Sequence, residues 1–244
     1  MSIYIYQLNN FTCEYILIIG EDMKNGALRG IIQFILALAV VIVLDNFYFT
    51  MLGKVNIHPS GSMYNVATFV KYLLEFIVAV IIYREEIFSG KSRFNKSLLT
   101  SSIIALVTFI VMVVFTLITK KVLLNFDMIV PGSFVNYFAQ TMTFDSALQM
   151  IINCFIKPCL IASIFVLGVS NIISKEMLGM VVSGLCYGLF LYFLMKYNYL
   201  QLIIPVVNVV ALTYLYKSTG NIYTCFITFI LYNLCGGLLL SYIL

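Results

Sequence analysis

Residues 98–119 read "LLTSSIIALVTFIVMVVFTLIT" and contain no charged side chain. A helix needs about 20 predominantly apolar residues to cross the hydrocarbon core of a bilayer. This stretch is long enough, and comparable stretches precede and follow it in a chain of 244 residues. Of all residues, 62% are hydrophobic and 10% are charged, which is far more apolar than a soluble domain requires. The sequence therefore predicts an all-α fold, a polytopic bundle of membrane-spanning helices.

The apolar stretches predict about seven spanning helices in one membrane domain. They lie at about 28–50, 64–83, 98–119, 147–173, 178–195, 199–216 and 222–243. The alternation of apolar and polar residues that a membrane β-barrel shows is absent. We divide the chain into a segment at 1–27, transmembrane helices with their loops at 28–146, and a C-terminal core at 147–244. Residues 1–22 are either native or an upstream extension before a start at Met23.

The basic residues predict the orientation, because cytoplasmic loops carry an excess of Lys and Arg. With the N-terminus inside, the inner loops hold eight basic residues and the outer loops four. The 84–96 loop is then cytoplasmic, and the 120–146 loop, with Asp127 and Asp145, lies outside. A composition rich in Ile, Phe, Tyr, Asn and Lys is typical of a low-GC bacterial genome. We predict a multi-pass protein of a bacterial cell membrane, with its N-terminus cytoplasmic and its C-terminus outside.

Ionisable residues inside the predicted spans are the first candidates for a functional site. Lys71 and Glu75 are four residues apart, so they lie on one helical face and can pair. A buried ion pair in a membrane bundle is a functional hypothesis by default. The alternative is a lysine near a helix end that reaches the membrane surface beside a counter-charge. Pro158 is expected to kink the fourth span or to start it afresh, which would place Lys157 at the outer boundary.

Residues with the chemistry of a hydrolase are scarce. A zinc hydrolase needs about three His, Asp, Glu or Cys ligands and a carboxylate that activates water, but His58 is the one histidine of the chain. Glu85 and Glu86 form an adjacent pair in a basic loop, with Gly90 where the Arg of an EExxxR motif would stand, and we expect both to be solvated. The six cysteines form no CxxC motif and are interpreted as packing residues.

Motifs for nucleotide and nucleic-acid chemistry are also missing from the sequence. No Walker A, GxSxG or Rossmann motif is present. The net charge of +4 comes mainly from basic residues between the apolar stretches, which is an orientation signal rather than a basic patch. We therefore expect the lipid bilayer as the surroundings of the chain and no nucleic acid as a partner.

The last four predicted spans carry spaced residues that resemble a known family. The set consists of Pro158, Phe165, Ser183, Tyr187, Tyr216, Thr219, Gly220 and Asn233. In this spacing they resemble the CPBP family, the CAAX-protease and bacteriocin-processing membrane proteins, also called Abi. The resemblance covers residues 147–244. It implies that the last four helices form a bundle like that of the intramembrane metalloproteases of this family.

The family positions that carry catalysis are replaced in this chain. The resemblance implies two Glu, one Arg and two His, with zinc as the cofactor of active relatives. The corresponding residues are Ile161, Ala162, Val166, Leu191 and Phe229. These apolar residues leave no set of zinc ligands, and the groups around a metal site cannot substitute for its ligands. We therefore expect no metal, no catalytic residue and no cofactor here.

The resemblance implies a function for an inactive relative. That function is bacteriocin self-immunity, or a role as the membrane binding or accessory partner of a peptide-processing or envelope system. The ligand would be a membrane protein or a hydrophobic peptide. One alternative is an active CAAX-type endopeptidase that uses an unrecognised site. The other is a small membrane transporter, or a transporter subunit, that uses Lys71 and Glu75.

Two residues of the last span have expected structural roles. Gly220 follows Thr219 at the entry to the final helix, where glycine permits backbone angles that other residues resist. Asn233 is an amide within an apolar helix. We expect it to bond across helices, or to a backbone carbonyl, because an unpaired buried amide is costly.

Overall fold

The computed structural model describes residues 2–55, 61–88, 97–124 and 143–243, and within them the side chains of 26–54, 61–88, 97–122 and 143–235. The described residues form helices and no strand. The elements are α1 (Ser2–Val55), α2 (Ser62–Ile82), α3 (Arg84–Phe88), α4 (Leu98–Leu124), α5 (Phe144–Ile151), η1 (Ile152–Ile156), α6 (Lys157–Ile161), η2 (Ala162–Gly168), α7 (Val169–Ile172), α8 (Glu176–Leu194), α9 (Tyr199–Thr219) and α10 (Ile222–Ile243).

Six helices among the described residues are long and apolar enough to cross a membrane. They are Gly26–Lys54, Ser62–Ile82, Leu98–Val122, Phe144–Ile172, Glu176–Leu194 and Tyr199–Thr219. In α10, Ile222–Cys235 adds a shorter apolar segment. The predicted polytopic helical bundle is therefore confirmed. His58, residues 89–96 of the predicted inner loop and residues 125–142 of the predicted outer loop lie outside the described residues.

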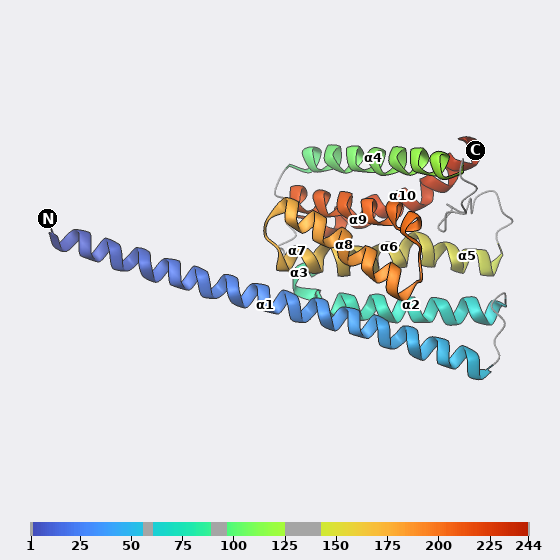
Figure 1. Cartoon of the computed structure of the whole chain (residues 1–244), viewed down its shortest axis with the longest axis horizontal. Coiled ribbons are helices and arrows are strands. Elements are labelled where there is room, and N and C mark those ends of the chain that lie inside the picture. The colour runs from blue at the N-terminus through green and yellow to red at the C-terminus, as the bar shows by residue number, and fades with distance from the viewer. Residues whose placement is uncertain (1, 56–60, 89–96, 125–142, 244) are drawn as a thin grey trace.

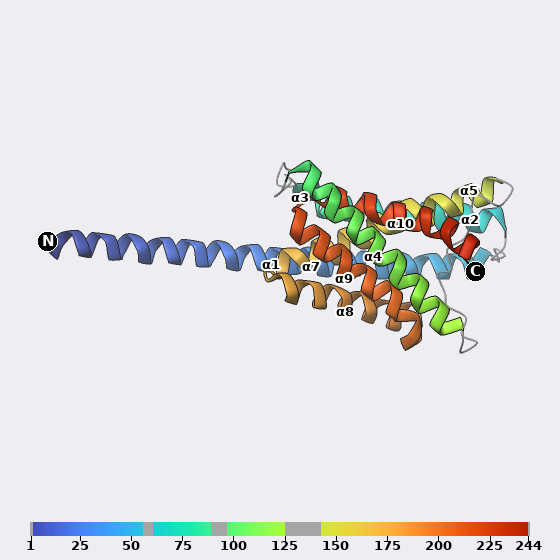
Figure 2. The same cartoon turned by 90° about the horizontal axis from the view of Figure 1, so that it is seen from above.

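The helices surround one central span, Phe144–Ile172. In Figure 1, α1 and α2 run side by side along one face of the bundle, and α4 lies on the opposite face next to α10. Figure 2 shows α4 crossing over α9, while α8 and α9 lie against each other. The central span contacts α1, α2, α8, α9 and α10. Within its apolar stretch of 18 consecutive residues 67% are buried, against 33% or less in the corresponding stretch of each of the other five spans, so it forms the core.

Pro158 lies within the central span without ending it. The span begins at a capping box in which Thr143 and Ser146 bond each other's backbone. It then passes through the π-helical turn η1, α6 with Pro158 near its start, and a second π-helical stretch, η2. A π-helical turn shifts the hydrogen-bond register, which accommodates the missing N–H of a proline. The expectation that Pro158 places Lys157 at the outer boundary is therefore wrong, because Lys157 lies mid-span.

The turn between α9 and α10 depends on a left-handed glycine. Gly220 has φ 71° and ψ 10°, and its N–H donates to the Tyr216 carbonyl at 2.7 Å. The Thr219 hydroxyl donates to the Leu215 carbonyl at 2.7 Å. The Asn221 side chain accepts from the Tyr223 N–H at 2.8 Å and so caps α10. The expected use of glycine for an unusual backbone angle is confirmed at this position.

Small residues bring α8 close to α9. A Cβ atom added to Gly184 would lie 2.6 Å from Val210 Cγ2, and one added to Gly188 would lie 3.0 Å from Val206 Cγ2. The Ser183 and Thr213 hydroxyls, both fully buried, are 2.7 Å apart across the same interface. Glycines four residues apart and bonded hydroxyls are the usual means by which membrane helices associate. This contact holds α8 against α9.

Candidate functional site

Four ionisable side chains from three helices meet inside the membrane domain. We name Asp45 of α1, Lys71 and Glu75 of α2, and Lys157 of α6 the charged cluster. The exposed fraction of the side chain is 14% for Asp45, 7% for Lys71 and 1% for Glu75. Lys71 lies near the middle of α2, far from either helix end. The alternative of a lysine that reaches the membrane surface from a helix end therefore does not describe it.

The ammonium group of Lys71 lies between two carboxylates. It contacts Asp45 Oδ1 directly, and its Nζ is 3.6 Å from Glu75 Oε1. The Tyr72 ring lies beside it, with its centroid 4.0 Å from Lys71 Nζ and 4.6 Å from Lys157 Nζ. One aromatic ring thus contacts both cations, a cation–π arrangement that is strongest where water is excluded.

The second lysine is held by the central span itself. Lys157 Nζ donates to Asn153 Oδ1 at 2.9 Å, four residues earlier in the same span. It is close enough to interact electrostatically with Asp45, Lys71 and Glu75. The cluster therefore contains two carboxylates and two ammonium groups. This balance matters because an ionised side chain at the bilayer centre costs about 2.5–3.5 kcal/mol on insertion scales.

Glu75 differs from Asp45, the other carboxylate of the cluster, in its distance from a cation. Neither of its carboxylate oxygens accepts a hydrogen bond from the described residues, although both are buried. Its nearest cation is Lys71 at 3.6 Å, which is longer than a charge-assisted hydrogen bond of about 2.7–2.9 Å. A buried carboxylate with unused acceptor capacity is rare in folded proteins. The cluster is therefore incompletely satisfied: Asp45 Oδ1 also accepts no hydrogen bond from the described residues, but it is in direct contact with the Lys71 ammonium group, whereas Glu75 has no such close contact.

A second polar group ties α1 to the end of α2. Arg29 pairs with Glu85 at 2.6 Å, and both side chains are more than half exposed. The Gln33 amide donates to the Ile82 carbonyl at 3.0 Å and to Glu86 Oε1 at 3.3 Å. Glu85 is solvated as expected, but the expectation is wrong for Glu86, whose side chain is only 20% exposed. Gln33 reaches across from α1 and covers it.

Tyr83 lies beside this second group, between α2 and α3. Its side chain is fully buried. Burial raises the pKa of Tyr83, and the Glu86 carboxylate raises it further. The hydroxyl group is therefore neutral and packs against the central span, where a Cβ added to Gly168 would meet it at 2.5 Å.

The five residues that the resemblance assigns to catalytic positions lie in one apolar core. Ala162, Val166, Leu191 and Phe229 are 7% exposed or less, and Ile161 packs against the same core. Phe165 and Tyr187 lie in this core as well, with ring centroids 4.9 Å apart. None of the five replacing side chains offers a metal ligand. The residues present therefore do not fit the zinc that the resemblance implies for active relatives.

Other candidate ligands do not gather elsewhere in the described part of the chain. It contains no group of three or more His, Cys, Asp or Glu that could hold a metal ion. The five cysteines whose side chains are described are free, and Cys154 and Cys225 are fully buried. Asn233 donates to the Phe229 carbonyl of its own helix at 2.8 Å. Of the two expected partners, a group on a neighbouring helix or a backbone carbonyl, the structure therefore shows the backbone carbonyl.

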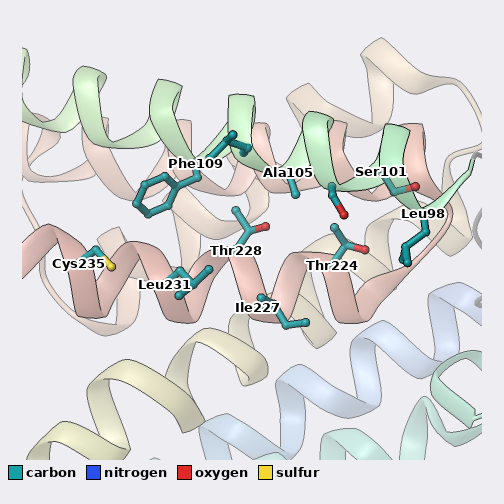
Figure 3. Close-up of a pocket in the computed structure, with 11 residues that line it drawn as sticks. Leu98, Ser101, Ala105, Phe109, Thr224, Ile227, Thr228, Leu231 and Cys235 are labelled. Atoms are coloured by element: carbon teal, nitrogen blue, oxygen red, sulfur yellow. The ribbon is translucent and has the colours of Figure 1, made fainter.

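An apolar groove of about 480 Å³ runs between α4 and α10. Figure 3 shows Phe109 of α4 and Leu231 of α10 along it, with Thr224 and Thr228 directed toward α4. The Ser101 hydroxyl lies at the end where both helices begin, and it is buried without a hydrogen-bond partner among the described residues. The described residues that line the groove include no charged one, so the charged cluster and the groove are separate features.

The sequence identified Lys71 and Glu75 but missed their partners. Asp45 was visible as the one acidic residue within the first span, which is itself a signal in a membrane helix. Spacing along one helix predicts pairs within that helix only, so it could not connect Asp45 of α1 with Lys71 of α2. Lys157 was missed because the expected break at Pro158 placed it at the outer boundary of the membrane and not in its interior. Tyr72 and Asn153 carried no signal beyond their position next to or near a lysine.

The fold and the charged cluster define a polytopic α-helical membrane protein with ionisable groups buried in its interior. Comparison with protein-family models, with curated proteins and with solved structures finds no match to this chain.

Proposed function

We propose that this chain is a non-catalytic bacterial membrane protein of the CPBP type that binds a membrane protein or a hydrophobic peptide. The apolar filling of the five replaced family positions carries the proposal. Ala162, Leu191 and Phe229 pack in one core, where a metalloprotease needs polar ligands and space for a water molecule. Side chains packed in this way supply neither. The role that the family resemblance implies is self-immunity to a bacteriocin, or assistance to a peptide-processing or envelope system.

The groove between α4 and α10 supports binding as the mode of action. Membrane helices associate through close packing and through Ser and Thr hydroxyls, because apolar surface gives little driving force within lipid. The groove combines an apolar wall with the hydroxyl groups of Ser101, Thr224 and Thr228. A hydrophobic segment that inserts there could bond to Ser101, whose hydroxyl has no partner within the described part of the protein.

The test restores the family residues and measures zinc. One variant carries all five substitutions, namely Ile161→Glu, Ala162→Glu, Val166→Arg, Leu191→His and Phe229→His. This five-fold variant should bind about one zinc per chain, while the unchanged protein binds none. A matched control moves the two histidines to Phe190 and Thr228. Size-exclusion chromatography and circular dichroism establish that each variant is folded. A folded five-fold variant without zinc would refute the family-like arrangement, and cleavage of CAAX-type peptides by the unchanged protein would refute the non-catalytic function.

A second candidate function is transport, and the charged cluster is the observation that favours it. Buried acidic and basic residues at mid-membrane mark ion and proton pathways in many transporters. Purified protein in liposomes should then move protons or a charged solute, and Glu75→Gln should abolish the flux. Arg29→Gln at the exposed ion pair should leave it intact. Absence of flux for protons and for a panel of small charged solutes would refute this candidate.

A further inference from the structure

Glu75 is the one member of the charged cluster without a described partner at hydrogen-bonding distance. Its side chain is 1% exposed, and both carboxylate oxygens are buried without a hydrogen bond from the described residues. An ionised carboxylate in an apolar interior needs a close cation or several donors to offset its lost hydration. Glu75 has one cation at 3.6 Å, so the ionised form is poorly stabilised in this arrangement.

Asp45 and Glu75 compete for the Lys71 ammonium group, and the carboxylate farther from it lacks a close cation. Lys71 Nζ contacts Asp45 directly and is more distant from Glu75. Lys157, the other cation, is bound by Asn153 at 2.9 Å. Asp45 thus holds the ammonium group that both carboxylates share. Of the two acidic residues, Glu75 is the one that a proton would stabilise.

Several charged and titratable groups act on Glu75 from the elements packed around it. They are Asp45 of α1, Lys71 of the same helix and Lys157 of α6, with Tyr72 close by in sequence. Proton uptake at Glu75 changes the charge of the cluster by one unit. The Tyr72 ring contacts both ammonium groups at 4.0 and 4.6 Å, and its negative face offsets part of that added positive charge.

We propose that Glu75 is a reversible proton-binding site at the centre of the membrane domain, with Lys71 as the group that responds to its protonation. In the protonated state Lys71 pairs with Asp45, as the structure has it. In the ionised state Lys71 is shared between both carboxylates. This site does not rest on the family resemblance. Proton-coupled transport would require it, but the site can exist in a protein that transports nothing.

The direct test is infrared spectroscopy of the whole protein in lipid between about pH 5 and about pH 9. A buried protonated carboxyl group gives a C=O band that is distinct from the bands of ionised carboxylates. The band should be present at the acidic end, decrease as the pH rises, and be missing in Glu75→Gln. It should persist in Glu85→Gln, which alters an exposed carboxylate. A native protein without such a band throughout this range would overturn the proposal, as would a band that Glu75→Gln leaves unchanged.

A chemical probe gives an independent result. A hydrophobic carbodiimide takes the proton of a buried carboxyl group on nitrogen, and the carboxyl oxygen then adds to its central carbon, so protonated carboxyl groups in membranes react selectively. Mass spectrometry should find the adduct on Glu75, with several-fold less at the alkaline end. Asp45→Asn should still form it. Adducts on other carboxylates together with none on Glu75 would contradict the proposal.

Discussion

Removal of the Lys71 ammonium group is the sharpest perturbation of the charged cluster. Lys71→Met retains a long apolar side chain and removes the charge between Asp45 and Glu75. Asp45 then loses its direct partner, and both carboxylates depend on Lys157. Truncating one partner of a buried ion pair is strongly destabilising, because the other charge remains buried and uncompensated.

The expected magnitudes follow from the contacts. Lys71→Met should lower the free energy of unfolding by about 3–5 kcal/mol. Asp45→Asn should cost about 1.5–3 kcal/mol, the usual worth of a hydrogen bond to a charged group. Glu75→Gln should cost less than about 1 kcal/mol, since this carboxylate accepts no hydrogen bond from the described residues. Arg29→Met should also cost less than about 1 kcal/mol although Arg29 is only 2.6 Å from Glu85, because exposed pairs are screened by solvent.

The assay is reversible unfolding in mixed micelles with an increasing fraction of denaturing detergent. The chain has no Trp, so circular dichroism follows the loss of helix. The double variant Lys71→Met with Asp45→Asn should be more stable than the sum of the single changes predicts, by about 0.5–3 kcal/mol. The reasoning is refuted if Lys71→Met costs no more than Arg29→Met, or if Asp45→Asn and Glu75→Gln are equal.

Three further predictions concern packing, backbone and topology. Gly184→Ala should destabilise the protein by about 1–3 kcal/mol in the same assay, because its Cβ would lie 2.6 Å from Val210. The control variant Gly26→Ala should be neutral or stabilising, because a Cβ there would have no atom within 4 Å. Equal effects of the two variants would contradict the close α8–α9 contact. Gly220→Ala should cost about 1–2 kcal/mol, since φ is 71°, and an unchanged stability would show that this turn adopts another conformation. In a background without native cysteines, Lys121→Cys should react with an impermeant thiol reagent from outside the cell and Lys175→Cys should not; the reverse pattern would invert the predicted orientation.

The fold was predictable because each membrane span is decided by local composition. A stretch such as 98–119 has no other stable location than lipid or a protein core, and α4 covers it from Leu98 to Leu124. The ends were less accurate, as α4 runs five residues past the prediction, because helices continue beyond the hydrocarbon until a turn signal stops them. At the turn signal of Gly220 the predicted start of the final span, residue 222, coincides with the start of α10 at Ile222, although α9 continues past its predicted end at 216 to Thr219.

The candidate site was only half predictable, for a reason of geometry. The pair Lys71 and Glu75 follows from the helical repeat. The contact of Lys71 with Asp45 depends on how α1 packs against α2, which no spacing within one helix contains. Pro158 shows a different failure: the rule that proline ends a helix holds for regular α-helix, but the π-helical turn before it changes the register. Lys157 consequently remains inside the membrane domain.

The two proposed functions depend on different parts of the chain, which makes them separable. Asp45, Lys71 and Glu75 belong to α1 and α2, outside residues 147–244, on which the proposed CPBP-type function rests. Leu191 and Phe229 of the apolar core lie within that region. The central span belongs to both, since it carries Lys157 and, just over one turn later, Ala162. If the protein acts by binding a partner in the groove between α4 and α10, neutral variants of the cluster that remain folded should retain binding. If it acts through ions or protons, those variants should lose function while Phe229→Leu, which preserves an apolar core, retains it. A variant series on the two sides of the central span therefore assigns the function even while the ligand is unidentified.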